Sequence, residues 1–252
     1  NKYCFIGLRL TIAQGLLLGG LLVASAQPEP QAISRTRPNV VLIYMDDMGF
    51  GDVDAYGGVG YTTPNIDLLA AQGMRFTQYF SVQPICSASR AAILTGCYAN
   101  RIGIHGALMP HSSFGLSDKE LTIAGMLKKV GYATGIIGKW HLGDAYKFLP
   151  LQHGFDEYFG LPYSNDMWPM NYDGHAFKDT SSKKSRFPPL PLMEGNKVVR
   201  YIKTMDDQNM LTTWYTEHSE AFIRRHRSEP FFLYLAHSMV HVPLGVSASF
   251  RG

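Results

Sequence analysis

Three short runs of apolar residues divide the chain, and each has the length and composition of a buried strand. The runs cover residues 39–44, 132–137 and 231–235. Continuous apolar runs of this length are typical of strands that are covered on both faces, as in parallel sheets. The pattern therefore predicts a sheet whose central strands lie inside the protein.

Segments with helical signals lie between these runs. Pro64 stands where the first turn of a helix begins, Gly96 follows a helical segment as a stop, and Ser117 with Glu120 forms a capping-box pattern. The predicted helices cover residues 65–72, 87–94, 117–130 and 207–227. Because strands and helices alternate, the sequence predicts an α/β fold with a mainly parallel sheet flanked by helices.

The N-terminal segment has the pattern of an export signal. Basic residues precede an apolar run over 16–23, and the small residues at 24–26 suit a cleavage site. We expect a signal peptide over 1–26 and a proline-containing leader over 27–37. A membrane anchor is the alternative, but the apolar run is short for a span, so no stable membrane association is expected after cleavage. The chain has no Asn-x-Ser/Thr sequon, which favours a bacterial periplasmic or secreted protein.

The composition and charge of the chain argue against nucleic-acid binding and against a disulfide. The chain has 252 residues, 46% of them hydrophobic, and a net charge of +3. Basic residues are scattered apart from a short cluster over 183–186, so nucleic-acid binding is not expected. Outside the predicted signal the cysteines are Cys86 and Cys97. They flank a predicted helix of about three turns, too long for a disulfide to bridge.

Ionisable residues follow each predicted strand, where α/β sheets gather their chemistry. Asp46 and Asp47 follow the first strand, and such paired carboxylates suit Ca²⁺ or Mg²⁺, although a solvated turn has the same composition. Lys139 and His141 follow the second strand, where an extended backbone directs both to one face; a structural pair is the alternative. Residues 163–200, rich in Pro, Gly, Asn and Lys, predict a long excursion over this edge.

Histidines follow the last strand and a cysteine opens a helix. His237 and His241 come after residues 231–235, and either suits a general acid or an ordinary loop position. Cys86 stands at the start of the helix over 87–94, where unpaired N–H groups favour an anion, and Arg90 lies one turn on. A half-buried structural cysteine and a thiolate nucleophile are the alternatives.

Taken together, these motifs resemble the type I sulfatases, and the arylsulfatase A branch in particular. The resemblance runs from about residue 38 to the end. Its motifs, in family order, are the segments at 39–49, 63–67, 86–96, 138–143, 154–160, 161–164 and 241–243. Each motif alone is weak, but the combination is specific. The resemblance implies an alkaline-phosphatase-like fold, with residues 38–252 as the N-terminal part of a sulfatase catalytic domain.

The resemblance also implies a nucleophile that is made after translation. In this family the cysteine matching Cys86 is oxidised to Cα-formylglycine, whose hydrated form attacks the sulfur of a sulfate ester. The second hydroxyl then expels sulfate and regenerates the aldehyde. By the same resemblance, Arg90 would hold the diol, and His141 would assist its proton movements.

The remaining site residues are carried over in the same way. Asp46 and Asp47, with residue 86, would hold Ca²⁺, or Mg²⁺ in its place. Lys139 would bridge the diol and the sulfate group, and Ser164 would touch the substrate. His241, two residues before a proline, would protonate the leaving oxygen.

Two departures from the family pattern limit what this chain is expected to do. Cys97 stands where the family often has arginine, which weakens a contact near Arg90. The family's further metal ligands, an Asp and an Asn, and its second sulfate-binding lysine lie beyond a point matching Gly252. We therefore expect a fragment truncated before the C-terminal part, which binds Ca²⁺ poorly and does not turn over by itself.

Two other functions remain open at this stage. A phosphate or phosphonate ester hydrolase of the same superfamily would share the nucleophile and the metal site. A catalytically silent binding protein would keep the fold and leave Cys86 as a thiol. The Gly-Lys-Trp-His segment at 138–141 and the Pro-Tyr-Ser segment at 162–164 favour sulfate.

Ala88 predicts which enzyme matures the protein. The commonest form of the motif has proline at this position, and the aerobic, copper-dependent converting enzyme prefers it, whereas the radical, iron–sulfur maturase is associated with alanine. We expect the radical maturase to convert Cys86 and the aerobic enzyme to convert it less or not at all. Co-expression with each enzyme, followed by mass measurement of the peptide that carries residue 86, tests this. Equal conversion by both would show the prediction to be wrong.

Overall fold

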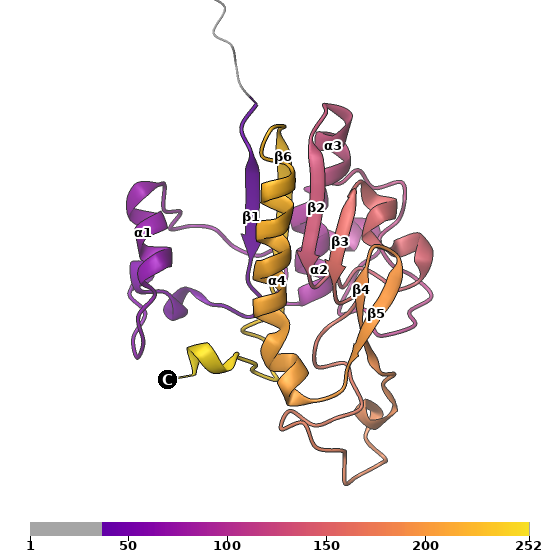
Figure 1. The fold of residues 1–252 in the computed structure, drawn as a ribbon. Helices are drawn as coiled ribbons and strands as arrows, with labels where there is room; N and C mark the ends of the chain where they lie inside the picture. The colour runs from indigo at the N-terminus through magenta and orange to yellow at the C-terminus, as the bar shows by residue number, and fades with distance from the viewer. Residues whose placement is uncertain (1–36, 252) are drawn as a thin grey trace, which may run out of the picture. The chain divides into compact units, whose positions relative to one another are not determined.

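A computed structural model describes residues 37–251, which form a six-stranded sheet with helices on both faces (Figure 1). The strand order is β1-β6-β2-β3-β4-β5. Parallel pairing joins the first four strands of this order, and antiparallel pairing joins the last two to them. The predicted α/β class with a mainly parallel sheet is confirmed, while the predicted signal peptide lies outside the described residues.

The strands that carry the parallel part are short and almost wholly apolar. Their bounds are β1 Val40–Tyr44, β2 Ala133–Gly138, β3 Glu157–Gly160 and β6 Phe231–Ala236. The antiparallel pair consists of β4 Leu190–Glu194 and β5 Lys197–Ile202. This pair begins within the segment over 163–200 that we expected to be a long excursion, and it ends two residues beyond that segment.

Helices cover the two faces of the sheet. The α-helices are α1 Pro64–Gln72, α2 Cys86–Thr95, α3 Ile123–Lys129 and α4 Met205–Arg225. Helix α4 packs across β6, β2 and β3 on one face, where Leu211, Tyr215 and Phe222 are buried (Figure 1). Helices α2 and α3 contribute Ala88, Leu94 and Ala124 to the core on the other face.

The predicted helix over 117–130 begins six residues later than expected. Thr122 is its N-cap, and the Thr122 hydroxyl accepts a hydrogen bond from the backbone N–H of Gly125 at 3.0 Å. The same hydroxyl donates to the backbone oxygen of His153 at 2.6 Å. Ser117 instead accepts a bond from the backbone N–H of Lys119 within a turn. The contact between Thr122 and His153 therefore favours Thr122 over Ser117 as the N-cap of the helix.

Strand β1 lies at the edge of the sheet in the described part of the chain. Val40, Leu42 and Tyr44 pack against the core, whereas Val41 is 45% exposed and Ile43 is 51% exposed. The outer face of this strand is therefore apolar but lies outside the cover that α4 provides. Among the described residues, none of the helices combines the length and the apolar character that crossing a membrane requires.

Two glycines allow β2, β3 and β6 to come together where the strands end. Gly138 has a φ of +115°, and a Cβ atom there would lie 1.9 Å from the backbone oxygen of Ala236. Gly160 has a φ of +157°, and its Cβ would lie 1.8 Å from the backbone oxygen of Gly138. Any larger residue would push apart the strand ends that lead into residues 139–141.

Substituting Gly138 should therefore weaken the fold strongly. We expect Gly138→Ala to lower the free energy of unfolding by about 3 kcal/mol, because the new methyl group meets fixed backbone atoms. At Gly96 the φ is +69° and an added Cβ would contact nothing within 4 Å. Gly96→Ala therefore introduces backbone strain without a steric clash, and should lower the free energy of unfolding by about 1 kcal/mol. Gly51→Ala, with open space around it, should change stability by less than about 0.5 kcal/mol. Urea unfolding measures all three, and equal effects would contradict the argument.

Candidate active site

Two buried cations meet on one buried carboxylate at the ends of the parallel strands. Lys139 and Arg90 have no exposed surface, and Asp46 is 5% exposed. The Lys139 ammonium forms an ion pair with Asp46 and also donates to the Ser164 hydroxyl at 2.9 Å. Arg90 approaches the same Asp46 oxygen at 3.4 Å. Burial by itself would raise the pKa of Asp46, but Arg90 and Lys139 outweigh it and lower that pKa.

Arg90 fixes the ends of several strands at once. From α2, its guanidinium donates to the backbone oxygen of Lys139 at 2.7 Å and to that of His237 at 3.1 Å. It also lies over the ring of Tyr44, 5.5 Å from the ring centre. These contacts follow β2, β6 and β1 respectively. The guanidinium therefore joins the same strand ends that deliver the site residues.

His141 is buried and neutral. Burial, and then the charges of Lys139 and Arg90, lower its pKa well below the usual value. Its Nε2 lies 2.9 Å from the backbone oxygen of Leu108, and because a carbonyl only accepts, Nε2 carries the proton. The Nδ1 atom is buried and has no partner among the described residues. His141 can therefore accept a proton at Nδ1.

The side chain of Trp140 packs into the core, but the extended backbone predicted through residues 139–141 is wrong, because His141 has a left-handed φ of 59°. Its ring is fully buried in the core and stacks on His153 at a centroid distance of 5.8 Å. The indole N–H donates to the backbone oxygen of Phe148 at 2.8 Å. Trp140 therefore anchors this segment while Lys139 and His141 face the site.

Cys86 is the first residue of α2, as the sequence predicted to within one residue. Its thiol is free and half-buried, so the predicted absence of a disulfide is confirmed. The adjacent Ser87 hydroxyl accepts a hydrogen bond from the backbone N–H of Leu108 at 3.0 Å. Because the Leu108 carbonyl accepts from His141, one residue connects the start of α2 with the histidine.

The two aspartates after β1 diverge. Asp46 is buried against the cations, while the Asp47 side chain is 64% exposed and lies 3.7 Å from Nε2 of His241. Asp47 has a φ of 57°, a left-handed backbone conformation that turns its side chain away from that of Asp46. His241 is held on its other side, where its Nδ1 contacts the backbone oxygen of Val242 at 2.6 Å.

The carboxylates suit a hard cation, but they are too few to hold it alone. Among residues 37–251 there is no group of three or more His, Cys, Asp or Glu side chains placed to bind a metal ion. Calcium takes six to eight oxygen ligands. Asp46 and Asp47 therefore match the donor type and supply part of a set.

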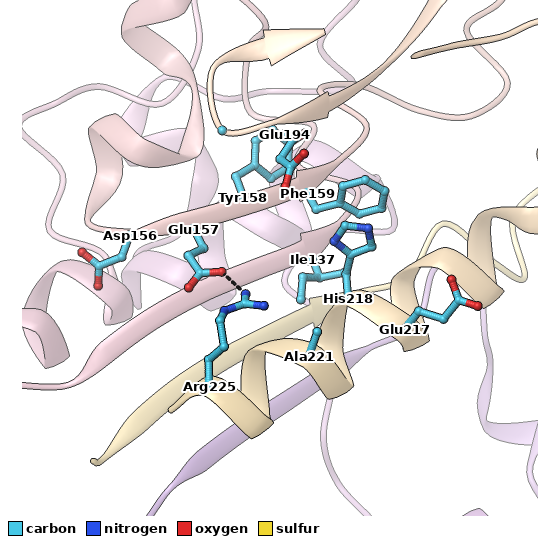
Figure 2. A pocket seen from close by; sticks show the side chains of 11 residues that line it. Ile137, Asp156, Glu157, Tyr158, Phe159, Glu194, Glu217, His218, Ala221 and Arg225 are labelled. Atoms are coloured by element: carbon cyan, nitrogen blue, oxygen red, sulfur yellow. Dashed lines mark hydrogen bonds and ion pairs between the residues drawn. The ribbon is translucent and has the colours of Figure 1, made fainter. Parts of the chain in front are cut away.

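One sizeable cavity lies away from these residues. It measures about 630 Å³ and is lined by β3 and α4, where the ring of His218 stacks on Phe159 at 3.5 Å (Figure 2). Two of its carboxylates are partnered, since Glu157 pairs with Arg225 and Asp156 pairs with Lys128. We interpret the cavity as a solvated gap beside a structural ion-pair cluster.

The structure divides the sequence-predicted residues into three sets. Asp46 and Lys139 join Arg90 and Ser164 by ion pairs and a hydrogen bond. His141 is linked through Leu108 to Ser87, the neighbour of Cys86, and Asp47 pairs with His241. Sequence reasoning missed the contribution of Ser87, Leu108 and Asn165. Asn165 lies just beyond the carboxyl end of β3, a strand of four residues that is too short to be predicted from the sequence.

The sulfatase family model matches residues 38–252. The chain belongs to the sulfatase family. It is similar to human N-acetylgalactosamine-6-sulfatase, with 38% identity over 91% of this chain and 43% of that protein. It is also similar to bovine arylsulfatase A, with 38% identity over 85% of this chain and 43% of that protein.

Solved structures agree with this assignment. The crystal structure of PsFucS1 sulfatase from Pseudoalteromonas sp. superposes with a TM-score of 0.76 at 33% sequence identity. The match covers 86% of this chain and 46% of that one. The predicted family and alkaline-phosphatase-like fold are confirmed. This sulfatase chain spans about half the length of the relatives that it matches.

His237 should make the stability of the sulfatase chain depend on pH. Burial, and then Arg90, lower the pKa of His237 from 6.5 to about 4. Between these values the unfolded chain binds more protons than the folded one, so stability falls as pH falls. From pH 7 to pH 5 this group should remove about 2 kcal/mol from the free energy of unfolding.

Urea unfolding at several pH values measures this effect. His237→Gln should flatten the decline between pH 7 and pH 5 by that amount, because glutamine does not titrate. Ser238→Ala alters the adjacent buried side chain without removing a titrating group, and should keep the wild-type decline. An unchanged slope in His237→Gln would refute the assignment.

Proposed function

We propose that the protein hydrolyses sulfate esters with a formylglycine nucleophile made from Cys86. The observation that carries the proposal is the buried excess of positive charge. Within residues 37–251, Asp46 is the carboxylate that pairs with both Lys139 and Arg90, and His141 is neutral, so this buried group retains one uncompensated cation. Uncompensated buried charge is unfavourable, and an anionic substrate oxygen would satisfy it.

Formylglycine fits the position of Cys86. The residue opens a ten-residue helix, where backbone N–H groups favour negative charge, and its side chain is partly accessible. When formed and hydrated, the group supplies a hydroxyl that attacks sulfur. The Cys86 sulfur atom in this structure stands for the precursor of that oxygen. Arg90, one turn along the helix, would stabilise negative charge on it.

The other residues receive their roles from their contacts. The Lys139 ammonium, already shared between Asp46 and Ser164, would bind a sulfate oxygen, and the Ser164 hydroxyl would orient the same group. His141 would accept a proton from the nucleophile at its free Nδ1. His241 would donate a proton to the leaving oxygen, and the Asp47 carboxylate lies 3.7 Å from its Nε2.

A calcium ion, or magnesium in its place, belongs to the same proposal. Asp46, Asp47 and the oxygen that replaces the Cys86 sulfur would contribute ligands, and further ligands are required. The ion would neutralise charge on the sulfate group during the reaction. Binding of the ion to this chain alone should be weak, because the set of ligands is incomplete.

A sulfated carbohydrate is the substrate class that the relatives favour. The names of several relatives specify a sulfated amino sugar, and Ps i-CgsB, which is 29% identical to this chain, was solved with k-i-k-neocarrahexaose. Sulfated polysaccharides, glycolipids and small sugars all belong to this class. Export after signal cleavage and maturation by the radical enzyme complete the proposal.

The proposal is tested by turnover in the complete, matured protein. We expect hydrolysis of 4-nitrophenyl sulfate to exceed that of 4-nitrophenyl phosphate. Cys86→Ala should abolish it, and Lys139→Ala should reduce kcat by about 10²-fold or more, because a preorganised charge is lost. Cys97→Ser is the matched control and should retain activity. Faster turnover of the phosphate ester would favour a phosphate or phosphonate ester hydrolase. An intact thiol at residue 86 in native material would favour a catalytically silent binding protein.

A further inference from the structure

The side chain amide of Asn165 lies against the loop that carries His241. Asn165 has no exposed surface. Its Nδ2 atom is 3.4 Å from the backbone oxygen of His241, 3.4 Å from that of Val242 and 3.5 Å from that of Pro243. Each contact is long, but one amide group serves three consecutive carbonyls. Among residues 37–251, the Val242 carbonyl is also contacted by Nδ1 of His241 at 2.6 Å, whereas the carbonyls of His241 and Pro243 have Asn165 as their hydrogen-bond partner.

Asn165 is itself fixed by helix α4. Its backbone oxygen accepts a hydrogen bond from Nε2 of Gln208 at 2.8 Å, and Gln208 is fully buried. The far end of the loop is held to the same helix, because the backbone N–H of Val246 donates to Asn209 at 3.2 Å. The loop from His241 to Val246 is therefore attached to α4 at both ends.

The neighbour of Asn165 belongs to the active site. Ser164 accepts a hydrogen bond from the Lys139 ammonium at 2.9 Å. Two adjacent residues after β3 thus contact different parts of the site, Ser164 on the side of Lys139 and Asn165 on the side of His241. A displacement of this dipeptide would change the distance between the lysine and the histidine.

We propose that Asn165 is a positioning residue that holds His241 at a fixed distance from Lys139. The inference rests on the proposed function, in which Lys139 binds the sulfate group and His241 protonates the leaving oxygen. Both groups must contact one substrate at the same time, and misplacement by about 1 Å can reduce a rate about 10²-fold. Asn165 acts on the proton donor through the backbone and does not itself touch the substrate.

The proposal predicts a dependence on the leaving group. 4-Nitrophenolate is a good leaving group without protonation, whereas phenolate depends more strongly on receiving a proton. Poor placement of His241 should therefore slow the hydrolysis of phenyl sulfate more than that of 4-nitrophenyl sulfate. In the complete, matured protein, we expect Asn165→Ala to lower kcat about tenfold more for phenyl sulfate than for 4-nitrophenyl sulfate. Asn165→Asp, of equal size but without N–H donors, should behave in the same way.

Controls separate this effect from a loss of folded protein. Ser219→Ala removes another buried polar group of α4, whose hydroxyl has no partner among the described residues, and should leave both rates unchanged. His241→Ala should show the same dependence on the leaving group, and adding Asn165→Ala to it should cause no further loss. Equal losses on both esters, or additive losses in the double variant, would overturn the proposal.

A second measurement covers the case in which the wild-type protein cleaves neither ester, so that the proposed function has failed. Hydrogen exchange over residues 241–246 in the 252-residue chain should then be faster in Asn165→Ala than in wild type, with the sheet unaffected. If that variant does not fold, Gln208→Met removes the support from α4 and leaves the Asn165 side chain present. Unchanged exchange in the folded variant would show that Asn165 does not hold the loop.

Discussion

The buried guanidinium of Arg90 is the contact on which the site depends. One side chain from α2 reaches the carbonyls that follow β2 and β6 and the carboxylate that follows β1. Parallel strands direct their ends to one edge, but they do not fix the distances between the loops that leave them. Arg90 supplies that restraint with several donors in one rigid plane. Its charge also lowers the pKa of Asp46, and it adds to burial and Lys139 in lowering the pKa of His141.

This arrangement requires α2 to lie close to the sheet. The helix presents Ser87, Ala88 and Ala91 to the interior, and all three are fully buried. Larger residues would lift the helix, and Arg90 would no longer reach the strand ends. Gly138 plays the same part within the sheet, where only hydrogen fits beside Ala236. Small residues on both sides thus allow long charged residues to meet at the centre.

The sequence predicted the parts of the fold that depend on local composition. Apolar runs indicated β1, β2 and β6, and glycine stops indicated α1 and α2 to within one or two residues. Strand β3 was missed because it has four residues, too few to establish a period. The start of α3 was wrong because the contact of Thr122 with His153 is not visible in sequence.

The site was predictable as a set of residues but not as an arrangement. The rule that chemistry follows parallel strands pointed to Asp46, Lys139 and two histidines. The family resemblance favoured His241 over His237 and supplied Ser164. The divergence of Asp46 from Asp47 depends on a left-handed backbone at Asp47, which the sequence does not specify. The contacts of Asn165 join segments about 77 residues apart, so only the folded chain reveals them.

The pairing of β1 with β6 has a consequence for the order of events during synthesis. Asn39, beside β1, contacts Phe231 across 192 residues. At about 5 to 20 residues per second, a ribosome needs about 10 to 40 s to make that stretch, and β1 has no partner on that side until then. Ser87, Ala88 and Arg90 become buried only as the sheet assembles around α2. If a maturase recognises Ala88, as proposed, it would have to meet the chain before the sheet closes, because the finished fold buries that residue.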